Sequence, residues 1–241
     1  MADSISLVSL NIELDQHFER IFPFFEKVNP DVLCVQELRE EDIPLFEKNI
    51  GVKCFYVPMA HQVYRGVSET FGVGIFSKLP VLSTGVKNYY GNAEKVPDYI
   101  NPDQNTVSRV LLYCDVVKNN STFRVGTTHF TWTFGGVPDD LQRRDLKGFL
   151  LALEEAGEIV FTGDFNAPRG GEIFGELAKR FKDNVPQKYT TSIDVAFHKN
   201  PNIKNLMVDG IFSTKSYSVE GVEMICGLSD HCALVAKVSK V

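Results

Sequence analysis

The sequence predicts one α/β domain, spanning residues 1–241, in which a mixed β-sheet is accompanied by a few helices. Short apolar runs of the kind expected for buried strands recur along the chain and are separated by turns. Two of these runs, 109–117 and 122–131, flank a polar turn and predict a β-hairpin. Helical periodicity is confined to a few segments between the strands. Because hairpins and helical connections both occur, we expect a mixed sheet rather than a purely parallel one.

The remaining elements follow from the same patterns. Strands are expected at 5–13, 31–38, 71–78, 109–117, 122–131, 158–163, 205–213, 217–225 and 232–238. Helices are expected at 17–28, 138–156 and 171–181. Pro23 interrupts the first helix, which should therefore either kink there or begin late. Segments 58–70 and 87–106 are polar and lack periodicity, so we expect surface loops, which in compact domains are often functional.

The composition is that of an ordinary globular protein, with 44% hydrophobic and 23% charged residues. The formal net charge of −6 argues against non-specific attraction to phosphate backbones, because such attraction usually requires a basic balance. An anionic ligand would therefore have to be met by a local site or by a bound cation.

The N-terminal stretch MADSISLVSLNIE has no basic region followed by a long apolar run, and no stretch approaches about 18 uninterrupted apolar residues. We therefore expect a cytoplasmic protein without a signal peptide or a membrane contact. None of the five cysteines shows C-x-x-C spacing, and all are expected to be free thiols in a reducing compartment. They are Cys34, Cys54, Cys114, Cys226 and Cys232.

The stretch FTGDFNAPRGGE, residues 161–172, places a carboxylate and a carboxamide at the end of an apolar run. Asp164 and Asn166 are two residues apart, just before a Pro-Arg-Gly-Gly segment. An ordinary turn would explain them, because Asp, Asn, Gly and Pro all favour turns. A site at the carboxyl end of a strand would explain them equally well, so the stretch alone leaves both interpretations open.

Polar residues end or interrupt other apolar runs in the same way, namely Asn11, Glu37, His129, Asp209, Asp230 and His231. Each has an ordinary explanation of its own: Glu37 could cap a helix, His129 could be a hydrogen-bonded core histidine, and Asp230 could be a turn residue. A buried carboxylate without a partner is costly, however. If these side chains converge, they predict a site for a hard metal ion with phosphate-binding donors around it.

Seven motifs, SLNI, DVLCVQE, GVGIFSK, TTHF, GDFNAP, VDGIF and LSDHCAL, resemble in kind and order those of the endonuclease/exonuclease/phosphatase superfamily of deoxyribonuclease I-like phosphoesterases. The resemblance runs from about residue 5 to residue 238. Each motif is weak alone, and the shared order carries the identification. The resemblance implies a four-layer α-β-β-α sandwich, in which two mixed β-sheets pack face to face with helices outside. This agrees with the strand-rich pattern.

The resemblance also implies roles for the metal-binding positions. Glu37 is similar to the metal-ligating glutamate, and Asn11 matches an asparagine near both the metal and the phosphate. Asp230 resembles an acidic residue that helps to hold metal or water. Magnesium or manganese is therefore the expected cofactor, because these ions prefer oxygen ligands and stabilise the negative charge that develops on a phosphate.

The catalytic positions follow in the same way. Asp164 resembles the aspartate that activates the attacking water or handles the leaving group, and Asn166 would orient that water and the phosphate. His231 resembles a histidine that contacts a non-bridging phosphate oxygen, and Asp209 the carboxylate that orients it. His129 matches a second phosphate-contacting histidine. Histidine donors held in place in this way stabilise the transition state.

The expected substrate is a phosphodiester at a nucleic-acid end, as for a nuclease or a tyrosyl-DNA phosphodiesterase. Trp132, the only tryptophan, follows His129 and could stack on a base or aromatic leaving group, or could be a packed aromatic under the loop. Arg169 resembles, with an offset of one residue, an arginine of tyrosyl-DNA phosphodiesterases of the second type. It is therefore a second candidate for substrate binding.

Two other classes of function stay open at this point. One is a phosphatase or phosphodiesterase acting on a small-molecule or lipid phosphoester, and the other is a non-catalytic binding module, which the complete set of acidic motif positions disfavours. We expect a monomer. Asp194 and His198 are interpreted as structural residues, and His17 and His61 as surface residues.

Overall fold

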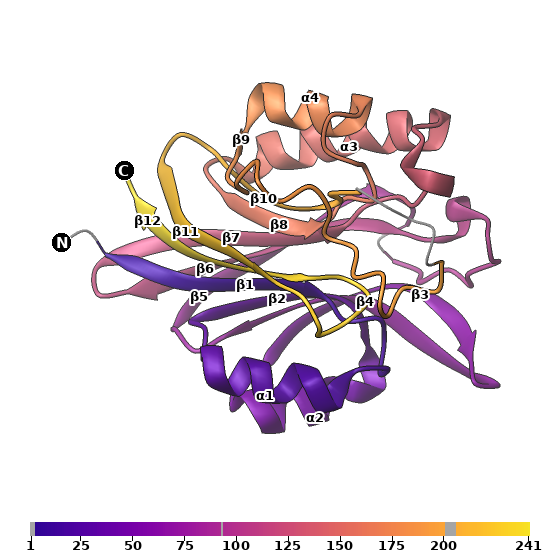
Figure 1. The fold of residues 1–241 in the computed structure, drawn as a ribbon, viewed down its shortest axis with the longest axis horizontal. Helices are drawn as coiled ribbons and strands as arrows, with labels where there is room; N and C mark the ends of the chain where they lie inside the picture. Colours follow the sequence, from indigo (N-terminus) through magenta and orange to yellow (C-terminus); the bar gives the residue numbers. More distant parts are fainter. Residues whose placement is uncertain (1–2, 93, 201–205) are drawn as a thin grey trace.

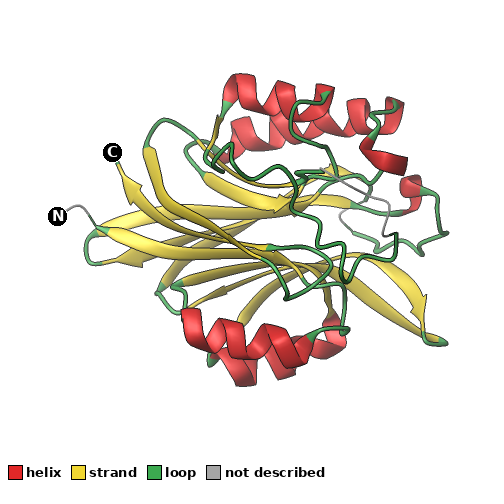
Figure 2. Cartoon of the chain, in the orientation of Figure 1, coloured by secondary structure: helices red, strands yellow, loops and turns green. Residues whose placement is uncertain are grey.

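The computed structural model describes residues 3–92, 94–200 and 206–241. Two six-stranded β-sheets pack face to face, and helices cover the outer face of each (Figure 1; Figure 2). Helices α1 (Phe18–Val28) and α2 (Ile43–Ile50) lie on one side, and α3 (Asp140–Ala156) and α4 (Glu172–Arg180) on the other. The predicted four-layer α-β-β-α sandwich is confirmed. None of the described helices is long and apolar enough to span a membrane.

The first sheet has the strand order β11-β12-β1-β2-β4-β3. Its strands are β1 (Ser4–Asn11), β2 (Val32–Arg39), β3 (Cys54–Tyr64), β4 (Val67–Ser77), β11 (Tyr217–Ile225) and β12 (Ala233–Lys240). Strands β1 and β2 are parallel, and their connection carries α1. The other neighbours pair antiparallel, so this sheet is mixed, as expected.

The second sheet has the order β5-β6-β7-β8-β10-β9. Its strands are β5 (Val81–Tyr90), β6 (Arg109–Lys118), β7 (Ser121–His129), β8 (Val160–Asp164), β9 (Lys182–Asp183) and β10 (Asp209–Ser213). Strands β7 and β8 are parallel and are connected through α3. Each sheet therefore contains one parallel pair of strands. Polar residues lie at the carboxyl ends of the strands in both pairs.

The core between the sheets is built from apolar side chains of both inner faces. Leu7 and Val73 of the first sheet and Val125 and Ile211 of the second are fully buried in one continuous cluster. A second apolar cluster lies under α3 and α4, and a third lies under α1 and α2. Because residues alternate between the two faces of a strand, β1 and β8 are apolar on both sides, as their continuous apolar runs indicate.

Helix α1 begins at Phe18, so the alternative of a late start at Pro23 is wrong. Pro23 lies within the helix. Ile21 and Phe25 on its apolar face are buried in the third cluster, and this burial offsets the hydrogen bond that a proline cannot donate. Asn29 ends the helix in the left-handed conformation that is common at helix C-termini.

The expectation that 58–70 is a surface loop is wrong, because strands β3 and β4 form a long hairpin through it (Figure 1). Strand β3 lies at the edge of its sheet, where partly exposed polar side chains obscure the apolar pattern. Residues 87–90 belong to β5, which is likewise an edge strand. Residues 91–106 contain only the short 3-10 helix Gln104–Thr106 among their described part and lie beside the hairpin through a bridge between His61 and Asp98.

The expectation that all five cysteines are free thiols is wrong for two of them. Cys226 and Cys232 form a disulfide, whereas Cys34, Cys54 and Cys114 are free. The turn between β11 and β12 brings the paired Cα atoms to 4.3 Å, a proximity that the spacing of the residues did not reveal. The disulfide therefore closes the loop that contains two of the predicted site residues.

Candidate active site

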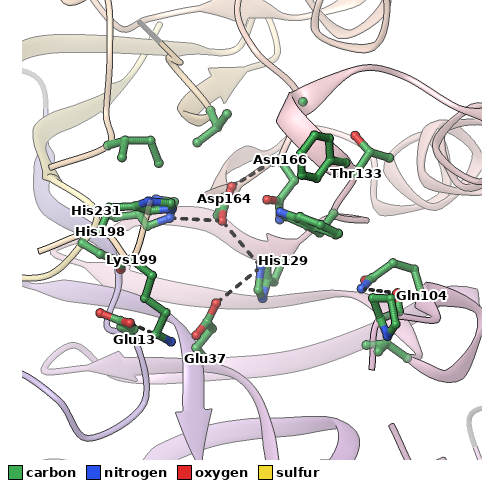
Figure 3. A pocket seen from close by; sticks show the side chains of 18 of the residues that line it. Glu13, Glu37, Gln104, His129, Thr133, Asp164, Asn166, His198, Lys199 and His231 are labelled. Carbon is green, nitrogen blue, oxygen red and sulfur yellow. Dashed lines mark hydrogen bonds and ion pairs between the residues drawn. The ribbon is translucent and has the colours of Figure 1, made fainter. Parts of the chain in front are cut away.

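The polar strand ends converge at one edge of the two packed sheets (Figure 3). Asp164 ends β8 and pairs in register with His129 at the end of β7 and with Asp209 at the start of β10. Asn11 ends β1, and its amide nitrogen lies 3.1 Å from a carboxylate oxygen of Glu37 on β2. Side chains from both sheets thus meet around Asp164, so the strand-end interpretation of its motif holds.

A β-bulge directs the Glu37 side chain towards this edge. The pairing of β2 with β4 shifts register between Gln36 and Leu38, and Glu37 has a positive φ of 58°. Bulges re-aim side chains and are common beside active sites, and a positive φ is uncommon for residues other than glycine. Asn166, with φ of 48°, adopts the same conformation. Two strained residues in one site indicate that the surrounding structure holds them there.

Asp164 and Asn166 are also linked directly. Oδ1 of Asp164 accepts a hydrogen bond of 2.8 Å from the Asn166 backbone N–H, as in an Asx turn. The Asn166 amide donates to the carbonyl of Phe130 at 3.0 Å, and the buried Arg109 guanidinium donates to the same carbonyl at 3.2 Å. Both interpretations of the motif therefore apply, because the turn itself holds the two side chains at the site.

His231 forms a buried pair with Asp209. Its Nδ1 lies 2.7 Å from Oδ2 of Asp209, and its Nε2 lies 3.7 Å from Oδ2 of Asp164. Burial works against the charged ring, but the negative charges of Asp209 and Asp164 outweigh it and raise the His231 pKa well above its usual value. At neutral pH this histidine is therefore an imidazolium.

His129 lies on the other side of Asp164 and differs in charge. Its Nε2 is 3.5 Å from Oδ2 of Asp164 and 3.9 Å from Oε1 of Glu37. Burial, with smaller contributions from the charges of Arg109 and His231, lowers its pKa well below the usual value. The site therefore holds one cationic and one neutral histidine on either side of a single carboxylate.

The carboxylates of the site lie close together, and the His231 imidazolium lies beside Asp164. Burial, followed by the charge of Asp230, raises the Glu37 pKa to about 7. Burial is also the main reason that the Asp164 pKa is raised to about 6. Among the described residues, no Lys or Arg forms an ion pair with Glu37, Asp164 or Asp230. Asp164, Asp209 and His231 offer ligand atoms within 4.8 Å of one another. Carboxylate oxygens are the ligands that divalent cations prefer, and a cation bound here would supply the missing positive charge.

A cavity of about 760 Å³ opens over these residues. Seven of the sequence-predicted residues line it, namely Glu37, His129, Trp132, Asp164, Asn166, Asp230 and His231. Asn11 and Asp209 lie behind this surface, 1% and 4% exposed. Trp132 is 42% exposed, so it is not an aromatic packed under its loop.

Arg169 does not fit the expected role in substrate binding. Its guanidinium pairs with Asp183 at 2.9 Å, donates to the carbonyl of Val185 at 2.9 Å, and does not line the cavity. The interpretation of His198 as purely structural is also incomplete, because this residue lines the cavity (Figure 3). Asp194 does have a structural role, since its carboxylate accepts backbone N–H groups of Ala196 and Gly227.

The two histidines assigned to the surface are partly buried. The His17 side chain is 12% exposed and lies 3.0 Å from a carboxylate oxygen of Glu13. His61 lies on β3, where its backbone hydrogen-bonds with Pro97 and Tyr99. The 91–106 segment therefore pairs with the edge strand β3 and partly covers His61, which the sequence pattern predicted to be exposed.

Sequence reasoning missed three charged residues in the cavity, namely Glu13, Arg109 and Lys199. Glu13, only 6% exposed, pairs with Lys199 at 3.1 Å, and both line the cavity (Figure 3). The backbone N–H of Glu13 also donates to the Asn11 side-chain oxygen at 3.2 Å, which orients that amide. The position of Glu13 two residues after Asn11 was the available signal, whereas nothing in the sequence linked Lys199 to the site.

Solved structures share this architecture over essentially the whole chain. An endonuclease/exonuclease/phosphatase from Bacteroides vulgatus has a TM-score of 0.76 at 18% identity and covers 99% of this chain and 100% of its own. A Bacteroides thetaiotaomicron mannosyl-6-phosphatase gives 0.71 at 13%, with coverages of 97% and 99%. D. rerio TDP2 complexed with a single-strand DNA product gives 0.71 at 16%, with coverages of 99% and 100%. At these identities the likeness shows the fold.

Sequence comparison gives the family. No curated protein matches the chain. The profile of the Endonuclease/Exonuclease/phosphatase family matches residues 8–231, from the first strand to the histidine that pairs with Asp209. Since this match covers most of the chain, the protein belongs to the endonuclease/exonuclease/phosphatase family, whose members are phosphoester hydrolases.

Proposed function

We propose that this protein is a divalent-metal-dependent phosphodiesterase that hydrolyses phosphodiester bonds at nucleic-acid ends. The observation that carries the proposal is the buried His231–Asp209 pair beside carboxylates that no Lys or Arg neutralises among the described residues. A positively charged hydrogen-bond donor beside a metal-ion site suits an anionic ester, because negative charge builds up on the phosphate oxygens during attack. Magnesium or manganese, held by Glu37 and Asp230 with Asn11 beside them, would supply Lewis-acid stabilisation of that charge.

The other side chains of the site have separate roles in the proposed reaction. Asp164 lines the cavity, and its Oδ1 accepts a hydrogen bond from the Asn166 backbone N–H. Its carboxylate either accepts the proton of the attacking water or serves the leaving group. The Asn166 amide orients the water and the phosphate. Nε2–H of His231 donates to a non-bridging phosphate oxygen, because Nδ1 is held by Asp209. Neutral His129 offers a second contact to the phosphate.

The proposed substrate class rests on the aromatic lining of the cavity. Trp132 is 42% exposed, and Phe134 of the same loop is 83% exposed. Exposed aromatic faces beside a phosphate site suit stacking with a nucleobase or an aromatic leaving group, which is worth about 1–3 kcal/mol per base. The D. rerio TDP2 structure, which contains a single-strand DNA product, supports the same class by analogy.

The second candidate is a small-molecule phosphoester. The cavity of about 760 Å³ has only two lysine or arginine side chains in its described lining, Lys199 and the buried Arg109. A long nucleic acid usually requires a more extended basic track. The mannosyl-6-phosphatase among the structural neighbours is an example of the small-molecule class on this fold.

A substrate panel with Mg²⁺ tests the proposal and separates the two candidates. We expect turnover of 5′- or 3′-modified single-strand oligonucleotides and of a nitrophenyl phosphodiester to exceed turnover of sugar and lipid phosphates. Full activity after treatment with a chelator would contradict the metal requirement. No hydrolysis of any ester by metal-loaded protein would favour a non-catalytic binding module.

Substitution of Trp132 sharpens the substrate assignment. Trp132→Ala should raise KM for nucleotide substrates roughly tenfold, because stacking is lost, while the melting temperature changes little. Leu151→Ala, an exposed apolar position on α3 outside the cavity, is the control and should change neither quantity. A large fall in melting temperature with an unchanged KM would mean that Trp132 serves packing.

A further inference from the structure

The buried Ser192 lies in an irregular segment beside the active site and is 0% exposed. Its hydroxyl oxygen accepts hydrogen bonds from the backbone N–H groups of Val208 and Asp209, each at 3.1 Å. Strand β9 pairs with β10 only at Phe212 and Ser213. The serine hydroxyl therefore satisfies the backbone N–H groups of Asp209, the first residue of β10, and of Val208 just before it, where β9 does not pair.

The backbone of the same segment holds the loop that carries His231. The Ser192 carbonyl accepts from the Cys232 N–H at 2.8 Å, and Ile193 forms a β-bridge with His231. The Asp194 N–H donates to the Asp230 carbonyl at 2.8 Å. Residues 192–194 thus contact the loop immediately before β12 at three successive positions.

These contacts matter because Asp209 and His231 belong to different sheets. Asp209 begins β10 of the second sheet, whereas His231 lies two residues before the first residue of β12 in the first sheet. Their hydrogen bond of 2.7 Å therefore depends on the separation of the two sheets at this edge. Ser192 contacts both sides, through its hydroxyl to β10 and through its carbonyl to Cys232.

We infer that Ser192 is a positioning residue that sets the distance between Asp209 and His231 across the two sheets. The inference rests on the proposed phosphoester hydrolysis, because this pair is the one assigned to the phosphate. Ser192 does not line the cavity, so its effect on the reaction passes through Asp209. Misplacing a catalytic group by a fraction of an ångström is enough to slow turnover.

The first test is kinetic. Ser192→Ala removes the acceptor of the two N–H groups and should lower kcat roughly tenfold or more, with KM changed less than about twofold. Thr191→Val is the matched control, because the Thr191 hydroxyl bonds within its own segment and to Leu206, not to β10 or the His231 loop. An unchanged kcat in folded Ser192→Ala, or an equal loss in Thr191→Val, would overturn the inference.

A double-mutant cycle tests whether the effect passes through Asp209. In an Asp209→Asn background the pair is already impaired, so adding Ser192→Ala should lower kcat little further. A full additional tenfold loss would show that Ser192 acts independently of Asp209, against the inference.

Nitrogen-15 NMR of the histidine rings separates a failure of the inference from a failure of the proposed function, because it needs no substrate. The His231 Nδ1 resonance should move in Ser192→Ala in the same direction as in Asp209→Asn, and Thr191→Val should leave it in place. If Ser192→Ala does not fold, Ser192→Cys keeps a side chain of the same shape, slightly larger and with a weaker acceptor, and should show the same shift. A folded variant with an unshifted His231 resonance would overturn the inference, whether or not any ester is hydrolysed.

Discussion

Two groups of carboxylates lie near the end of β2, and among the described residues an arginine forms ion pairs in one group and not in the other. Arg39 pairs with four carboxylates, those of Asp15 at 3.3 Å, Glu41 at 2.8 Å, Asp42 at 2.5 Å and Glu69 at 3.1 Å. We call this the Arg39 cluster. Two residues earlier on the strand, Glu37 belongs to the active-site cluster, which also contains Asp164, Asp209 and Asp230. In the part of the chain that the structure describes, no arginine forms an ion pair with these four carboxylates.

The difference lies in how the negative charge is offset. In the Arg39 cluster a buried guanidinium, 7% exposed, also lies 5.3 Å from the ring centre of Tyr64. In the active-site cluster no Lys or Arg of the described residues forms an ion pair with Glu37 or Asp164, and burial raises the pKa of both carboxyl groups. Carboxylates that pair with an arginine stabilise the folded structure. Carboxylates without a lysine or arginine partner are available to bind a metal cation.

The largest expected effect comes from removing the arginine. Arg39→Met should leave several buried carboxylates without a cation and destabilise the fold by about 3–5 kcal/mol. Urea unfolding would measure the loss. Arg143→Met is the control, since Arg143 pairs with Glu172 on the exposed surface and should change stability little. If both variants lost the same stability, the Arg39 cluster would have no special structural role.

Asp209→Asn tests the active-site cluster with a smaller effect on stability. We expect kcat to fall roughly a hundredfold or more, the scale of losing one preorganised donor, with metal affinity nearly intact. Because the Asp209 charge helps to raise the His231 pKa, activity that needs the imidazolium falls as pH rises through that raised value. The variant should therefore move the alkaline limb of the pH–rate profile to lower pH.

The control for this prediction is Asp183→Asn, which removes a half-buried carboxylate from the same sheet but from outside the active-site cluster. It should leave kcat and the alkaline limb unchanged. If Asp183→Asn lowered kcat strongly and Asp209→Asn did not, the assignment of Asp209 as the orienting carboxylate would be wrong.

The smallest expected effect concerns the stability of the chelator-treated protein. The Glu37 pKa is about 7 when folded, above its ordinary value of 4.5, so the folded state holds the proton more tightly. The contribution of Glu37 to stability should therefore fall as pH rises from about 5 to about 8. Glu37→Gln should remove this part of the pH dependence and should abolish stabilisation by Mg²⁺.

Thermal unfolding at several pH values, with and without Mg²⁺, would measure both effects. Glu69→Gln is the matched control, because Glu69 is buried in the Arg39 cluster and should leave the stabilisation by Mg²⁺ intact. Equal stabilisation of wild type and Glu37→Gln by Mg²⁺ would remove Glu37 from the set of metal ligands.

The amino-acid sequence was enough to predict most of the buried strands and the chemical types of the side chains at the site. Continuous apolar runs such as 31–38 and 158–163 correspond to β2 and β8, because strands buried on both faces must be apolar throughout. The polar residues that interrupt or end such runs, including Asp164 and Asp209, stand out against that background for the same reason. Their order along the chain also pointed to the family that the sequence comparison supports.

Which side chains come into contact became visible in the three-dimensional structure. Arg169 follows Asn166 closely in sequence but turns to Asp183, whereas Lys199, far from any motif, reaches Glu13 in the cavity. The bulge at Glu37 depends on the register between β2 and β4, and the His231–Asp209 bond depends on the spacing of two sheets. Local patterns report which face of an element is buried. Contacts between elements follow from register and packing, which depend on residues distant in sequence.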